Sequence, residues 1–278
     1  MNKASDLHIH TLVSDGNATP HEMLSAAKEL GLEQISFTDH DALGAYRHWG
    51  DLFAPAKELG IELISGIELD TDYQDHEIHL LGYGFNLDNG PLNKHLNLTQ
   101  KLRKEKVSLQ MAIINRFFGR RVVDTAKVLL ADRDTLMKPH LIHAMLAQGM
   151  FSDYRAAAYW VSQNAQVAIV VPKLPLAAAM RMIRSAGGEA VLAHPGFLAR
   201  ETDISLISFL EEFVPLGLAG LEVDYPYLNT GPAFPDLESE RKLIGELRAL
   251  AVQFNLKTTR GSDAHDVGAL KKFATQYQ

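Results

Sequence analysis

The chain has 278 residues, of which 46% are hydrophobic and 22% charged, and this composition fits a globular protein of one large domain or two small ones. Its formal charge of −7 argues against a protein that binds nucleic acid over its whole surface. The absence of cysteine excludes disulfides, thiolate metal sites and thiol nucleophiles, so metal or acid–base chemistry must use the twelve histidines and 34 carboxylates.

Strand-like and helix-like segments alternate over the first 85 residues. A capping-box pattern predicts a helix that begins after Thr19, with Pro20 at the first helical position and Glu22 two residues later. A second helix is predicted over residues 44–59. The predicted strands of this part are residues 7–9, 34–38, 62–67 and 77–85.

A predominantly helical segment, residues 91–172, interrupts this alternation. The helices predicted within it are residues 92–118, 123–130, 139–148 and 154–162. From Thr99 to Pro172 the chain has eleven Lys and Arg against five Asp and Glu, a balance of +6 that leaves −13 for the rest. The segment is either a set of solvated charged helices or a cap that attracts an anionic substrate.

The alternation resumes after residue 173. The predicted helices are residues 176–185, 206–213 and 238–254, and the predicted strands are residues 190–193, 221–223 and 257–260. Such alternation predicts an α/β fold with a parallel sheet, either open or closed into a barrel. We therefore expect residues 1–90 and 173–278 to form this domain and residues 91–172 to form an inserted helical subdomain.

Histidines and carboxylates gather at or just beyond the ends of these strands, although each one alone is typical of a packing residue. His8 and His10 are two residues apart on a strand, so they share a face and can bind one metal. Parallel barrels and open α/β sheets place their sites at these strand ends. Nine ligands are more than one ion needs, which predicts two or three divalent ions, with Glu68 as a bridge. The candidate ligands are His8, His10, Asp15, His40, Glu68, His79, His194, Asp263 and His265.

The ordered motifs D-L-H-I-H, S-D-G, T-D-H-D, G-I-E, E-I-H-L-L-G-Y, A-H-P-G and G-S-D-A-H resemble the PHP (polymerase and histidinol phosphatase) family over nearly the whole chain. The resemblance implies a distorted (β/α)7 barrel with a trinuclear metal centre. A helical insert between the E-I-H-L-L-G-Y strand and the A-H-P-G strand is typical of the branch with 3′,5′-nucleotide bisphosphate phosphatases and 5′-to-3′ exoribonucleases. Histidinol phosphatases of the family typically have histidine at the position of Asp15, so the carboxylate here resembles the nucleotide-phosphatase branch instead.

The resemblance also implies how the ligands divide among three metal positions. The first takes His8, His10, Glu68 and Asp263; the second takes Asp15, His40 and His265; and the third takes Glu68, His79 and His194. Asp15, His40, Glu68 and Asp263 are therefore expected to be catalytic. Asp39, beside His40, is expected either to orient an imidazole or to cap a loop.

Five residues of the insert are candidates for substrate binding. Lys138 is expected at the N-cap of a helix, with His140 and His143 on one face, and this helix start can cradle phosphate. Relatives in the branch usually read R-P-H-x-A-R here, so Lys138 and His143 replace two arginines. Arg103 and Lys106 match an R-x-x-R pattern of relatives, and they are expected either to contact phosphate or to lie on a solvated helix face.

These observations predict a hydrolase, a phosphoesterase in which a hydroxide bound to manganese, zinc or iron attacks phosphorus. The resemblance implies a 3′,5′-bisphosphonucleotide or the 5′ end of a short single-stranded RNA as substrate. Three alternatives stay open: a phosphatase for another small ester, a cyclic-phosphate diesterase, and a metal-binding accessory module without catalysis. Duplex DNA and membranes are not expected as partners, and the cytoplasm is the expected location.

Overall fold

The fold is a curved sheet that closes on itself. The computed structural model describes residues 4–124, 133–228, 230 and 233–276. A parallel bridge between Ile9 and Ala264 joins the first strand to the segment after the last, and the His10 N–H donates to the Ala264 carbonyl at 2.9 Å. The strands in sheet order are β1 (Ser5–Ile9), β2 (Gln34–Phe37), β3 (Glu62–Tyr73), β4 (His76–Tyr83), β6 (Glu189–Leu192), β7 (Leu218–Asp224) and β8 (Lys257–Arg260), with β5 (Leu174–Pro175) beside β3. The distorted barrel expected from the sequence is confirmed.

One strand, β4, runs antiparallel to its neighbours, so the expectation of a parallel sheet is wrong for this strand. β4 is antiparallel to both β3 and β6. β3 continues to Tyr73 instead of ending at residue 67, and Gln74 and Asp75 then turn the chain with φ of 51° and 64°. Positive φ at both central residues is typical of a tight hairpin. Because β4 runs backwards, His79 in its interior reaches the same end of the barrel as the carboxyl ends of the parallel strands.

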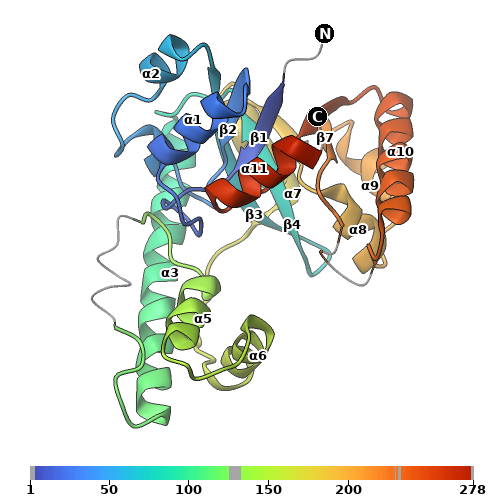
Figure 1. Ribbon diagram of the computed structural model, residues 1–278. Helices are drawn as coiled ribbons and strands as arrows, with labels where there is room; N and C mark the ends of the chain where they lie inside the picture. The colour runs from blue at the N-terminus through green and yellow to red at the C-terminus, as the bar shows by residue number, and fades with distance from the viewer. Residues whose placement is uncertain (1–3, 125–132, 229, 231–232, 277–278) are drawn as a thin grey trace.

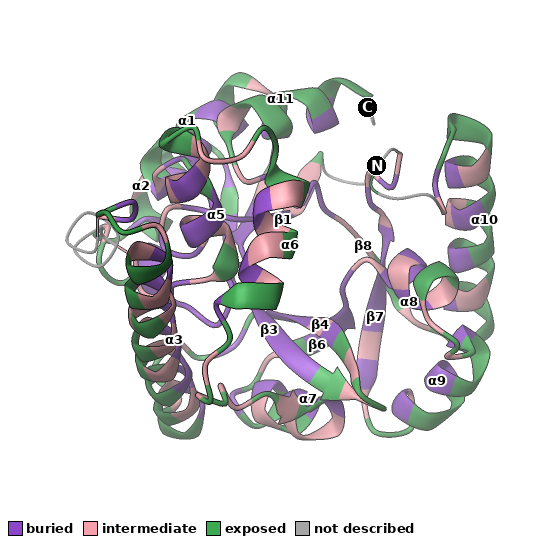
Figure 2. Cartoon of the chain, turned by 90° about the horizontal axis from the view of Figure 1, so that it is seen from below, coloured by how far each residue is buried: buried purple, intermediate pink, exposed green. Residues whose placement is uncertain are grey.

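Helices surround the barrel, with their exposed faces outward (Figure 2). The sequence pattern did not predict α8 (Pro195–Glu201) or α11 (Val267–Gln276). The predicted helix over residues 44–59 is interrupted at Gly50, whose φ of 83° is incompatible with an α-helix. Among the described residues, no helix has both the length and the apolar character of a membrane span. The helices of this part are α1 (Pro20–Glu29), the 3-10 turn η1 (Gly44–Tyr46), α2 (Phe53–Glu58), α7 (Leu176–Ser185), α8 (Pro195–Glu201), α9 (Leu206–Phe213), α10 (Leu237–Gln253) and α11 (Val267–Gln276).

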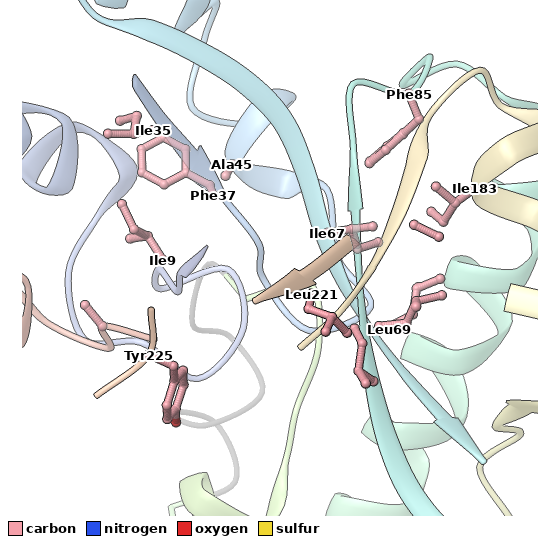
Figure 3. Close-up of a cluster of buried hydrophobic side chains, with 14 of the residues drawn as sticks. Ile9, Ile35, Phe37, Ala45, Ile67, Leu69, Phe85, Ile183, Leu221 and Tyr225 are labelled. Atoms are coloured by element: carbon pink, nitrogen blue, oxygen red, sulfur yellow. The ribbon is translucent and has the colours of Figure 1, made fainter. Parts of the chain in front are cut away.

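Strand alternation separates the apolar core from the polar interior. Ile67 and Leu69 of β3 lie in the buried apolar cluster, close to Ile183 of α7 (Figure 3). Side chains on a strand alternate between its two faces, so Glu68 and Asp70 point to the opposite side. Both are buried there, because that side is the interior of the barrel.

The insert contains α3 (Gly90–Phe117), α5 (Lys138–Ala147) and α6 (Tyr154–Asn164). Figure 1 shows α3 extending away from the barrel with α5 and α6 beside its outer half. A separate cluster of buried apolar residues, which includes Met111 and Met145, joins these helices. The predicted helix over residues 123–130 falls almost entirely outside the described residues.

The capping box at α1 gives a stability test. Thr19 Oγ1 accepts from the Glu22 N–H at 3.1 Å, and Glu22 Oε2 accepts from the Thr19 N–H at 2.7 Å. We expect Thr19→Ala to lower the free energy of unfolding by about 1 kcal/mol, because it removes the hydroxyl that accepts from the Glu22 N–H. Urea denaturation measures the change. Thr19→Ser keeps the hydroxyl and should stay close to the parent protein; an equal loss in both variants would contradict the capping role.

Candidate metal centre

The structure brings all nine candidate ligands to one end of the barrel, around Glu68. The Glu68 Oε2 atom lies 3.3 Å from His8 Nε2, 3.2 Å from His10 Nε2 and 3.3 Å from His40 Nε2. This oxygen is buried and has no hydrogen-bond partner among the described residues. Three imidazole nitrogens that converge on an unpartnered carboxylate oxygen fit a shared divalent cation.

The second oxygen of Glu68 faces a different pair of histidines. Oε1 lies 2.9 Å from His79 Nδ1 and 3.3 Å from His194 Nε2. The two oxygens of one carboxylate thus face two separate groups of nitrogen ligands. A carboxylate that bridges two cations has this arrangement.

The remaining ligands extend the cluster toward the barrel mouth. Asp263 Oδ1 lies 3.0 Å from His10 Nε2, and Asp15 Oδ1 lies 3.4 Å from His265 Nε2 and 3.6 Å from His10 Nδ1. Ligand atoms lie within 4.8 Å of one another in five overlapping triads, of which four consist only of candidate ligands and the fifth combines His79 with Asp70 and Glu77. The four triads are His8–His10–Glu68, His10–Asp263–His265, His10–Asp15–His40 and His40–Glu68–His79.

Mutual electrostatics favour the charged forms of His10 and Glu68. Burial alone lowers the pKa of His10, but Asp263 and Glu68 outweigh burial and raise that pKa to about 10. Burial raises the pKa of Glu68, but the charges of His40, His8 and His79 bring it well below its usual value. Protons and metal ions compete for the same ring nitrogens, so divalent cations can take the place of these protons.

Glu222, which the sequence pattern did not single out, fixes two of the ligands. It is fully buried on β7; its Oε1 accepts from His8 Nδ1 at 2.9 Å, and its Oε2 accepts from the His194 N–H at 2.8 Å. Since Nδ1 of His8 carries the donated proton, Nε2 is left free to bind a metal. The only signal in the sequence was an acidic residue inside an apolar strand.

Asp70 supports His40, a role for which Asp39 was one candidate. Asp70 Oδ1 accepts from His40 Nδ1 at 2.8 Å. Asp39 instead accepts from the backbone and hydroxyl groups of Thr11 and Ser14, so it caps the loop that follows β1. Of the two expected roles for Asp39, the geometry matches the loop cap.

Arg103 differs from both of its expected roles. It is buried rather than solvated, and it donates to Asp41 and, at 2.7 Å, to Asp70 Oδ2. An arginine that neutralises two buried carboxylates is engaged within the protein. Arg103 lies where α3 meets the candidate ligands, and Asp70 connects it to His40.

The other insert candidates fall into two groups. Lys138 and His143 are exposed, and Lys106 is half-buried. Met137, and not Lys138, is the N-cap of α5, because the lysine already belongs to the helix. His140 is half-buried, and both of its ring nitrogens are engaged: Nδ1 accepts from the Met137 N–H at 2.8 Å, and Nε2 donates to the Ser14 carbonyl at 3.1 Å.

The backbone is strained beside the centre. Asp41, His194 and Asp263 have φ of 44°, 27° and 52°, a region that side-chain-bearing residues rarely adopt. Tyr225 also donates its hydroxyl to Asp263 Oδ2 at 2.9 Å. Strained residues held by such contacts are typical of functional sites.

The PHP domain family matches residues 6–161 of this chain. A 5′-3′ exoribonuclease of Haemophilus influenzae is 29% identical over 95% of this chain and 91% of that protein. A phosphoribosyl 1,2-cyclic phosphate 1,2-diphosphodiesterase of Eggerthella lenta is 28% identical, with 94% and 93% covered. A 3′,5′-nucleoside bisphosphate phosphatase of Chromobacterium violaceum is 26% identical, with 69% and 66% covered.

The fold is also similar to that of a solved structure. A Bifidobacterium adolescentis protein, described as a metal-dependent phosphoesterase, superimposes with a TM-score of 0.75 at 23% identity. The superposition covers 96% of this chain and 90% of that one. It shows that the two proteins share the barrel architecture.

Glu222 offers a test of the centre that does not depend on turnover. Glu222→Gln removes the anionic acceptor of the His8 ring proton, so we expect the affinity for Mn²⁺ to fall by about 10–100-fold. Calorimetric titration of metal-free protein measures this affinity. The matched control is Glu212→Gln, at an exposed carboxylate that accepts from Tyr73 Oη. Unchanged Mn²⁺ affinity in Glu222→Gln would show that this contact does not orient a ligand.

Proposed function

This chain belongs to the PHP domain family and is a metal-dependent phosphoesterase, and we propose that its substrate is a nucleotide phosphate. The proposed substrate is a 3′,5′-bisphosphonucleotide or the 5′ end of a short single-stranded RNA. The names of the Haemophilus and Chromobacterium relatives, which describe these two activities, support this choice.

The placement of Glu68 carries the proposal. Its two oxygens face separate groups of imidazoles, and the carboxylate is buried. We assign three positions for manganese, zinc or iron. They comprise His8, His10, Glu68 and Asp263; Asp15, His40 and His265; and Glu68, His79 and His194.

Divalent ions at these positions would activate water as the nucleophile and neutralise charge on the phosphoryl group. The chain contributes the orientation of the ligands. Glu222 sets the His8 ring, Asp70 sets the His40 ring, and Tyr225 holds one oxygen of Asp263. Fixed groups of this kind need little rearrangement during the reaction, which lowers its barrier.

The insert provides the substrate contacts in this proposal. It joins the barrel at the ligand end, since Arg103 binds Asp70 and His140 binds the Ser14 carbonyl. Exposed Lys138 and His143 lie on the same helix as His140, and Lys106 follows Arg103 on α3. A basic cap over the barrel mouth favours the approach of anionic phosphate groups.

A cyclic-phosphate diesterase is the second candidate. The Eggerthella relative of that name matches nearly the whole chain at 28% identity. The same metal positions would serve a diester.

Substrate assays with the metal-loaded protein separate these functions. The substrates are a nucleoside 3′,5′-bisphosphate, a 5′-phosphorylated short RNA and phosphoribosyl 1,2-cyclic phosphate. We expect release of phosphate or mononucleotides from the first two. Hydrolysis of the cyclic ester alone would favour the second candidate, and full metal content without any turnover would identify a binding module.

Loss of single ligands should stop turnover without unfolding the barrel. We expect Asp15→Ala and His194→Ala to lose detectable activity, because each removes a ligand from a different metal position. Steady-state assays measure activity, and circular dichroism checks the fold. His21→Ala, at an exposed histidine on α1, is the control. Near-normal turnover in either ligand variant would refute the metal assignment.

Lys138 tests the role of the insert. Lys138→Ala removes an exposed positive charge, so we expect KM for the nucleotide to rise several-fold while kcat changes little. Initial-rate kinetics measure both constants. Lys138→Arg keeps the charge and should restore KM; an unchanged KM in Lys138→Ala would remove this residue from the substrate site.

A further inference from the structure

The helical insert grips the loop that carries Asp15. Arg133, just before α5, directs Nη1 at three carbonyl oxygens of this loop: Leu12 at 3.2 Å, Ser14 at 2.8 Å and Gly16 at 3.1 Å. The backbone N–H of Asp134 adds a bond to the Val13 carbonyl at 2.9 Å. A single guanidinium thus binds the carbonyls on both sides of Asp15.

His140 adds a second contact to the same loop. Its Nδ1 accepts from the Met137 N–H, so its Nε2 carries the proton that it donates to the Ser14 carbonyl. Burial and the nearby Arg133 lower the pKa of His140 to about 4, which keeps the ring neutral and in this tautomer at neutral pH. The imidazole therefore links the first turn of α5 to the residue before Asp15.

The barrel holds the other side of the loop. Asp39 accepts from the N–H groups of Thr11 and Ser14, so the barrel binds donors of the loop while the insert binds its carbonyls. The turn is tight: a Cβ on Gly16 would come within 2.8 Å of the His10 carbonyl. Held in this way, Asp15 Oδ1 lies 3.4 Å from His265 Nε2.

We propose that Arg133 and His140 are positioning residues, which hold Asp15 in place for the second metal position. This inference rests on the proposed function, because it concerns the ligand set Asp15, His40 and His265. A second contact between insert and barrel, from Arg103 through Asp70, ends on His40 of the same set. Both contacts thus orient ligands of the same proposed metal position.

Two substitutions of His140 separate loop positioning from helix capping. His140→Gln can still place an amide donor near Ser14. His140→Asn can accept from the Met137 N–H but is too short to reach the loop. If the loop contact matters, glutamine preserves metal content and asparagine does not. Arg133→Met and Arg133→Lys provide the corresponding pair at the other residue.

The measurement is Mn²⁺ bound per chain, obtained by elemental analysis after equilibration and desalting, together with Mn²⁺ titration. We expect His140→Asn and Arg133→Met to weaken binding of one equivalent by about 10–100-fold and to lower kcat more than they raise KM. His140→Gln should remain within about threefold of the parent protein in both readouts. Arg120→Met, at an exposed arginine of the insert, controls for lost charge.

Full Mn²⁺ content and affinity in both His140→Asn and Arg133→Met would overturn the proposal. An equal loss in His140→Gln and His140→Asn would overturn it as well, because the donor to Ser14 would then be irrelevant. If only one of His140→Asn and Arg133→Met folds, the Mn²⁺ content and affinity of that variant decide by the same criterion. Absence of phosphoesterase activity in the parent would refute the proposed function, whereas the metal readouts would still test the positioning role.

Discussion

A concentration of charge inside one end of the barrel governs the rest of this structure. Buried carboxylates and imidazoles are costly unless each finds a partner. Five histidines surround the two oxygens of Glu68. Two of these rings have a second carboxylate partner, Glu222 for His8 and Asp70 for His40. The alternation of strands makes the arrangement possible, because it turns apolar residues toward the helices and leaves the interior to polar ones.

The sequence was sufficient to predict the candidate ligands because each stands in a short local motif at a strand. The supporting residues were harder to predict. Glu222 and His8 are 214 positions apart, and only the closure of the barrel brings them together. Asp39 adjoins His40 in sequence, yet the partner of that ring is Asp70, which the unexpected extension of β3 places opposite it. Neighbours in sequence are a poor guide to hydrogen bonds across a sheet.

The same limit applies to the direction of β4 and to the insert. Alternating strands and helices favour parallel pairing, but a two-residue turn at Gln74 and Asp75 reverses the chain without any helix. In the insert, helical periodicity could place Arg103 on a face of α3 but could not say which face meets the barrel. Burial against Asp41 and Asp70 depends on that docking, which is a tertiary property.

The bridge between Ile9 and Ala264 has a consequence for biosynthesis. It places His8 and His10 beside Asp263 and His265, so one group of ligands combines the earliest and the latest barrel segments to leave the ribosome. A nascent chain that still lacks the segment after β8 lacks Asp263 and His265 and so presents an incomplete set of donors. The donor set is therefore complete only after the last strand and the segment that follows it have been translated.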